Sequence, residues 1–207
     1  MTDTFRTLAA PVRAEPPKTR GSRFVALAAP VASADAARAA VERVRRREAG
    51  ATHAAWAYRL GPDRPAPRSS DDGEPGGSAG PPVLREIEGR DLFGVVVVVA
   101  RHYGGTKLGV GGLARAYGSA AGAALDAGRA RVVVLREPVR LAFAFGDTAA
   151  AMRLLDVFDA VVAGQSHAPE GTRLDLRVRR SQAPALREAF VEATAGRGAV
   201  LPVGGPA

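Results

Sequence analysis

The sequence predicts an α+β protein built from two units. Alternating or continuously apolar runs, which are typical of strands, are interspersed with longer segments of helical periodicity. From residue 139 onward these segments follow the order strand–helix–strand–strand–helix–strand, which is the split βαβ, or ferredoxin-like, arrangement. The 207 residues suffice for one large domain or two smaller ones. We expect an irregular arm over residues 1–21, an N-terminal domain over 22–134 and a C-terminal domain over 135–207.

A strand over residues 23–31 is expected to open the N-terminal domain, followed by a helix. Ser33 is suited to cap this helix, and the helical pattern extends to about Glu48. The residues expected on its apolar side are Ala36, Ala40, Val41 and Val44. Arginines gather near its end, where the helix dipole favours cations, and a solvated helix face is their simplest interpretation.

The rest of the N-terminal domain alternates between strands, a break and helices. Residues 51–60 alternate as a strand, with His53 on the face that also carries Ala55. Residues 61–82 are so rich in proline and glycine that no regular element is expected there. The elements expected after this break are a short helix over residues 82–89, a strand over 95–100 and a helix over 113–127.

The C-terminal domain is expected to continue this alternation. Its strands are predicted over residues 132–135, 139–145, 160–167, 172–180 and 199–203. Its helices are predicted over residues 148–158 and 184–195.

The composition is that of a folded, basic chain without cysteine. Disulfides and cysteine metal sites are therefore excluded, and a cytoplasmic location is the default expectation. No apolar run is long enough to cross a membrane and the N-terminus has no apolar core of a signal peptide, so no membrane partner is expected. The net charge of +8 favours polyanionic partners, while a coding bias toward arginine would produce the same count.

The glycine-rich segment 101–117 is the first candidate for a binding site. Glycine lets backbone N–H groups converge, and the N-terminus of the helix that follows adds partial positive charge. Together with side-chain cations, such a segment binds anions, among which a nucleic-acid or nucleotide phosphate comes first. The candidate residues are Arg101, Gly104, Gly105, Lys107, Gly109, Gly111, Gly112 and Arg115. Alternatively, the glycines only permit a tight loop and close packing of helix on strand.

Asp71, Asp72 and Glu74 place three carboxylates close together in the proline- and glycine-rich break. Carboxylates so close repel one another unless a cation, an arginine or backbone N–H groups compensate. Mg²⁺ is one such cation, which makes these three residues candidate metal ligands. The alternative is structural, with the aspartates accepting hydrogen bonds from turn amides and pairing with nearby arginines.

His53 and His102 are candidates for acid–base chemistry. Together with Asp72 or Glu74 they could transfer protons or hold a metal. A hydrogen-bonded structural role is the alternative for each histidine. The catalytic residues are otherwise unknown from the sequence.

Several longer motifs resemble the bacterial YigZ/IMPACT family over about residues 22–130. The motifs are Arg23-Phe24, Ala51-Thr-His-x-x-Trp-Ala-Tyr58, Ser70-Asp-Asp-Gly-Glu-Pro75, Ser78-Ala-Gly-x-Pro82, Arg101-x-Tyr-Gly-Gly105 and Leu108-Gly-x-Gly-Gly-Leu-x-Arg-Ala-Tyr117. The resemblance implies an N-terminal domain with the fold of domain two of ribosomal protein S five, shared with elongation factor G domain IV, and a ferredoxin-like C-terminal domain. Both relatives touch ribosomal RNA, so the resemblance implies a role in translation or RNA binding, and it implies no settled enzymatic activity.

Three functions fit these observations. The first is an RNA- or ribosome-associated regulator of translation that binds through the basic glycine-rich loop. The second is a Mg²⁺-dependent enzyme that acts on a phosphorylated or nucleotide substrate. The third is a protein-interaction module in which the motifs serve mainly as scaffold.

Overall fold

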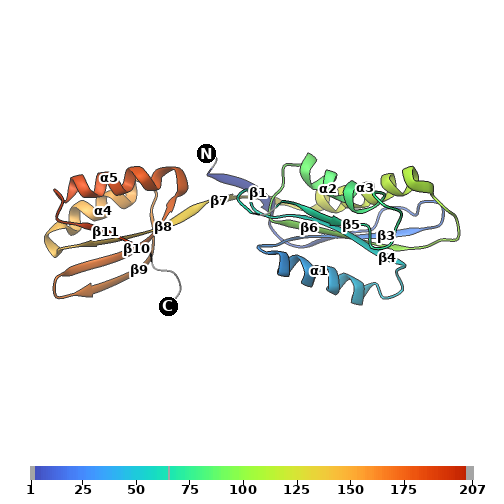
Figure 1. Ribbon diagram of the computed structural model, residues 1–207, viewed down its shortest axis with the longest axis horizontal. Helices are drawn as coiled ribbons and strands as arrows, with labels where there is room; N and C mark the ends of the chain where they lie inside the picture. Colours follow the sequence, from blue (N-terminus) through green and yellow to red (C-terminus); the bar gives the residue numbers. More distant parts are fainter. Residues whose placement is uncertain (1–2, 65, 204–207) are drawn as a thin grey trace. The chain divides into compact units, whose positions relative to one another are not determined.

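The computed structural model describes residues 3–64 and 66–203 and contains two compact units (Figure 1). The first unit is Phe5–Val133, and the second unit combines residues 3–4 with 134–203. The elements up to residue 134 are β1 (Thr4–Leu8), β2 (Val12–Ala14), β3 (Arg23–Pro30), α1 (Ala34–Arg47), β4 (His53–Arg59), β5 (Arg68–Ser70), α2 (Gly80–Gly89), β6 (Val95–His102), α3 (Gly109–Ala127) and β7 (Ala130–Val134). Those that follow are β8 (Arg136–Phe143), a 3₁₀ turn at Phe145–Asp147, α4 (Thr148–Val157), β9 (Val161–Ala168), β10 (Gly171–Arg179), a 3₁₀ turn at Arg180–Gln182, α5 (Ala183–Ala193) and β11 (Ala199–Leu201).

The first unit is built around an antiparallel five-stranded sheet in the order β2-β3-β6-β4-β5. Its central strand β6 is continuously apolar because helices cover both faces of the sheet, so residues of either parity are buried. Helices α2 and α3 lie on one face and α1 on the other (Figure 1).

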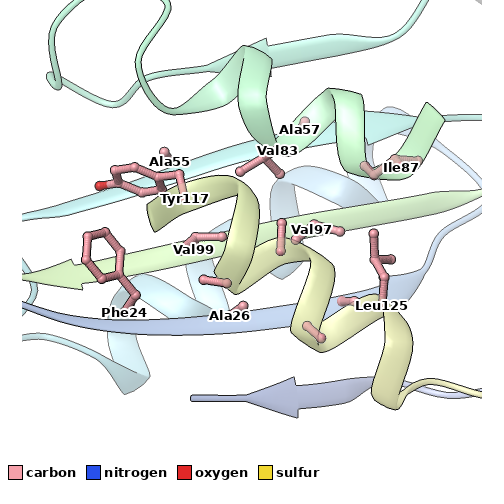
Figure 2. Packing of buried hydrophobic residues seen from close by; sticks show 14 of the residues in the cluster. Phe24, Ala26, Ala55, Ala57, Val83, Ile87, Val97, Val99, Tyr117 and Leu125 are labelled. Carbon is pink, nitrogen blue, oxygen red and sulfur yellow. The ribbon is translucent and has the colours of Figure 1, made fainter. Parts of the chain in front are cut away.

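The face under α2 and α3 carries the larger core (Figure 2). Strands β3, β4 and β6 supply alternate residues to it, and α3 packs closely because its buried side is largely alanine and glycine. Near the start of α3 the core contains the large side chain of Tyr117. Its ring packs edge to face on the ring of Phe24, with 5.2 Å between the ring centres. Since side chains alternate along a strand, Arg101 follows Val99 onto this face and His102 follows Ala100 onto the α1 face.

Helix α1 begins as its sequence predicts. The Ser33 Oγ accepts a hydrogen bond from the Ala36 N–H at 3.2 Å, which is the expected N-cap. The buried side of the helix consists of Ala37, Ala40, Val41 and Val44, so Ala37 takes the place predicted for Ala36.

The second unit has an antiparallel four-stranded sheet in the order β11-β8-β10-β9. Its elements follow the strand–helix–strand–strand–helix–strand order that the sequence predicts. Leu174, Leu176 and Val178 of β10 point into a core shared with α4 and α5, while the alternate residues are polar. Among the described residues no helix is both long enough and apolar enough to span a membrane.

Three predictions about local structure are wrong. The irregular arm predicted over residues 1–21, of which the first two lie outside the described part, contains β1, which pairs with β7, and β2, which pairs with β3. The predicted break contains β5, a short edge strand paired with β4. Helix α3 begins at Gly109, four residues before the predicted start at Leu113. In the first two cases hydrogen bonds to distant strands outweigh a weak local propensity, whereas the added first turn of α3 is largely exposed and extends the helix locally.

Candidate functional site

A cavity of about 570 Å³ lies on the α2–α3 side of the first unit, where β4 starts, β6 ends and α3 begins. His53 and Arg101 are cross-strand partners at this edge of the sheet, which brings two separate motifs together. The lining residues are Thr52, His53, Glu74, Pro75, Arg101, Tyr103, Lys107, Leu108, Gly109, Val110 and Leu113. The cavity therefore lies between the acidic segment, residues 71–74, and the glycine-rich segment 101–117.

A buried ion pair forms the inner wall of this cavity. The Arg101 Nη1 donates to both carboxylate oxygens of Glu74, at 2.8 and 3.0 Å, and the Tyr117 hydroxyl donates to the Glu74 Oε1 at 2.7 Å. The side chains of Arg101 and Glu74 are only 8% and 3% exposed. Burial and the neighbouring Glu74 carboxylate raise the pKa of Tyr117 far above its ordinary value, so its hydroxyl stays protonated.

This pairing corrects the role predicted for Arg101. Its charge is already matched by Glu74 inside the protein, so Arg101 does not offer a free cation to a phosphate. The Nε atom of Arg101 is buried without a hydrogen-bond partner among the described residues. The pair instead ties the acidic segment to the end of β6, and Tyr117 ties both to α3.

The three clustered carboxylates point to three different partners. Asp71 accepts hydrogen bonds from the N–H groups of Gly77, Ala79 and Gly80, at 2.8 to 2.9 Å. Burial alone would raise the pKa of Asp71, but these three N–H donors lower it below its ordinary value. Because Ala79 and Gly80 begin α2, the Asp71 carboxylate caps that helix from eight residues earlier in the chain.

Asp72 is held on the other side of the turn. Its carboxylate pairs with Arg45 and accepts the Ala54 N–H at 2.6 Å. With Glu74 committed to Arg101, the magnesium site predicted from Asp71, Asp72 and Glu74 is not formed by this arrangement. No group of metal-ligating side chains large enough to hold a metal ion occurs in the part of the chain that is described. The structural alternative for the two aspartates is confirmed.

The two histidines lie on opposite faces of the sheet, so the joint acid–base site predicted for them is wrong. The His53 Nδ1 is 2.7 Å from the backbone oxygen of Asp72. A carbonyl oxygen can only accept, so Nδ1 carries a proton and Nε2 is the nitrogen left to act as an acceptor in the neutral ring. The His102 Nε2 lies 2.8 Å from Arg23 and 3.0 Å from Glu48 on the α1 face.

The glycines of segment 101–117 have unequal roles. The Gly104 N–H donates to the buried Ser22 Oγ at 3.2 Å, and a Cβ at Gly104 would lie 2.0 Å from the Gly21 carbonyl carbon. Gly104 is therefore a packing glycine, and its N–H is not available to an anion. Gly105 and Gly109 adopt φ angles of 86° and 70°, which favour glycine, and face open space. Gly111 and Gly112 lie in the first turn of α3.

Comparison with known proteins fits these motifs. Residues 20–125 match the Impact N-terminal domain. The chain belongs to the IMPACT family. The family member in the pol 5′ region of Thermus thermophilus is 45% identical over 159 residues, which cover 76% of this chain and 84% of that protein. YigZ of Escherichia coli is 42% identical over 106 residues, which cover 50% of this chain and 52% of YigZ. The family predicted from the motifs is thus confirmed.

The two-unit fold is also found in a solved relative of this IMPACT protein. A crystal structure described only as that of a hypothetical protein aligns over 99% of both chains, with 27% identity and a TM-score of 0.72. The similarity therefore includes the second unit, which lies outside the matched Impact N-terminal domain.

The rim of the cavity in this IMPACT protein combines three features that suit an anionic, ring-containing ligand. Lys107 is exposed and forms no ion pair with any described residue. Tyr103 is 48% exposed, although the Arg101 guanidinium lies 5.3 Å from the centre of its ring. Helix α3 starts after Leu108 with no side chain of the described chain capping it, so its first N–H groups lack the usual internal acceptor.

Sequence reasoning missed Tyr103 and Val110 as rim residues and misplaced Arg115. A tyrosine directly after the end of a buried strand and before two glycines was the available signal for Tyr103. Arg115 lies one turn farther along α3 and lines a different hollow, with Arg85 and Glu86 of α2. Of the cations predicted to surround the glycines, Lys107 alone lines the cavity with an unpaired charge.

Proposed function

We propose that this IMPACT family member regulates translation by binding RNA, free or within the ribosome, at the rim where α3 begins. One observation supports this most directly: an unpaired lysine, an exposed tyrosine ring and an uncapped helix N-terminus meet at one cavity. Stacking on aromatic rings and neutralisation of phosphates are the two interactions with which proteins bind single-stranded RNA. A base would stack on Tyr103, and a phosphate would lie between Lys107 and the first N–H groups of α3.

The charge distribution supports the same unit as the RNA-binding part. Residues 5–133 contain 20 Lys and Arg against 12 Asp and Glu, which accounts for the whole net charge of +8. The second unit is close to neutral by the same count. A polyanion is therefore attracted to the first unit, and the attraction weakens with added salt.

The finer fold assignment belongs to the same proposal. We assign the first unit to the type of domain two of ribosomal protein S five and elongation factor G domain IV. We assign the second unit to the ferredoxin-like type, supported by its antiparallel order of fourth, first, third and second strand. The contacts of those relatives with ribosomal RNA, implied by the resemblance, favour the ribosome as the place of action.

Co-sedimentation with ribosomes and fluorescence anisotropy with a labelled oligouridine, each at low and moderate salt, test the proposal. Tyr103→Ala should weaken oligouridine binding by about 1–3 kcal/mol, the value of one stacked base. Lys107→Ala should weaken binding and reduce the salt slope by about 0.7, the contribution of one phosphate on a single strand.

The matched control is Arg153→Ala, which removes one exposed charge from α4 of the second unit. It should leave both assays unchanged. If Lys107→Ala and Arg153→Ala lose RNA affinity equally, only the total charge matters and the proposed site is wrong. If the wild type binds neither ribosomes nor oligouridine at low salt, the proposed RNA-binding function is refuted.

A further inference from the structure

A second cavity, of about 680 Å³, lies on the opposite face of the same sheet. Helix α1 packs on β6 and β4, and no described helix packs to a comparable extent on the part of this face formed by β2 and β3. The cavity lies between that part and the last turns of α1, and we call it the arginine groove.

The arginine groove has an aliphatic floor and a cationic rim. Val25 and Leu27 of β3 and Val44 of α1 form the floor. The rim consists of Arg13 on the β2 side and Arg43, Arg46 and Arg47 on the α1 side. Arginine stems extend the apolar lining while their guanidinium groups face water.

The charges of the rim are largely uncompensated. Arg43, Arg46 and Arg47 form no ion pair with any residue in the described ranges. Glu48 is the single carboxylate among the described lining residues. Its Oε1 already lies 3.5 Å from Arg13, and its Oε2 contacts Arg23 and His102. The groove therefore presents a net positive rim around an apolar floor.

We propose that the arginine groove docks an acidic segment of a partner protein, with one aliphatic side chain of that segment on the floor. Guanidinium groups bind carboxylates in a bidentate manner, and arginine is among the residue types that most often carry binding energy at protein interfaces. A leucine-sized side chain fits an aliphatic floor, and its burial supplies the apolar part of the affinity.

The lining favours a peptide over single-stranded RNA. Single-stranded RNA is bound by aromatic rings that stack on its bases together with cations along its backbone, and none of the described residues that line this groove is aromatic, so the stacking platform is missing. Tyr103, which is exposed, lies at the cavity on the other face of this sheet. The two faces of the sheet thus suit two chemically different partners, and the docking surface does not depend on the RNA-binding proposal.

The test measures binding of labelled synthetic peptides to the full chain by fluorescence anisotropy. The first probe alternates glutamate with leucine, and the second is polyglutamate of the same length. The variant Arg46→Gln/Arg47→Gln removes two rim charges and keeps helix propensity. Arg129→Gln/Arg131→Gln removes two exposed charges from the same unit outside the groove and serves as the control. Leu27→Ala reduces the apolar area of the groove floor.

We expect the glutamate–leucine peptide to bind more tightly than polyglutamate. In Arg46→Gln/Arg47→Gln its affinity should fall about tenfold, or about 1.4 kcal/mol, because two guanidinium partners of its carboxylates are removed. Leu27→Ala should reduce the preference for the leucine-containing probe. Three results would each overturn the proposal. The control Arg129→Gln/Arg131→Gln could lose as much peptide affinity as Arg46→Gln/Arg47→Gln, or the wild type could bind neither peptide. Alternatively, oligouridine could compete with the peptide and itself bind more weakly to Arg46→Gln/Arg47→Gln. Lys107→Ala, which tests the RNA site, should leave peptide binding unchanged.

Discussion

The buried pair of Glu74 and Arg101 provides the sharpest test of how this site is held together. Arg101→Met removes the cation and leaves the Glu74 carboxylate, 3% exposed, with the Tyr117 hydroxyl as its remaining side-chain partner. Breaking a buried pair in this way costs about 3–5 kcal/mol, because an uncompensated charge stays in the interior. The first unit has about 130 residues, for which unfolding entropy near 60 °C is about 0.27 kcal/mol/K. The expected fall in its melting temperature is therefore about 11–18 °C.

The double variant Glu74→Gln/Arg101→Met separates charge from packing. The glutamine keeps an acceptor for the Tyr117 hydroxyl but carries no charge, so the double variant should lose only about 1–2 kcal/mol. Trp56, the single tryptophan, lies in β4, so its fluorescence reports the unfolding of the first unit separately from the second. If the double variant is as unstable as Arg101→Met, the cost comes from lost packing and the reasoning about charge is refuted.

Five further substitutions test the turns around the site by the same fluorescence measurement. Asp71→Ala should cost about 1–2 kcal/mol as a lost helix cap. The pKa of Asp71 is lowered in the folded state, so its ionised carboxylate stabilises the fold above the ordinary pKa of 3.8, and this stabilisation is lost as the pH falls through the folded pKa. The difference in the free energy of unfolding between the wild type and Asp71→Asn should therefore narrow in acid. Gly73→Ala, at a φ of 86°, should cost about 1–2 kcal/mol, whereas Gly76→Ala meets open space and should stay within about 0.5 kcal/mol. Gly104→Ala places a Cβ 2.0 Å from the backbone of Gly21 and should destabilise more than Gly73→Ala; a neutral result would contradict the packing role of Gly104.

The candidate site could be assembled from the sequence only in part. The motifs predicted that the acidic and glycine-rich segments matter, and strand parity places His53 with Ala55 and Ala57 on one face. Parity along β6 also separates Arg101 from His102, because neighbouring residues of a strand point to opposite faces. What parity cannot predict is the partner of each charge. Asp71, Asp72 and Glu74 lie within four residues of one another, yet each meets a donor from a different segment.

Apart from the short edge strand β5, the sequence by itself determined the succession of helices and strands from Arg23 onward, the Ser33 cap and the family. Periodicity, capping and motifs are read over a few neighbouring residues. Only the tertiary structure decided that β1 pairs with β7, that Arg101 is neutralised by Glu74 and that an arginine-rimmed groove remains beside α1. These features depend on segments that are far apart in the chain and meet only after folding. Their energies come from burial and from hydrogen bonds between distant groups, which no local pattern records.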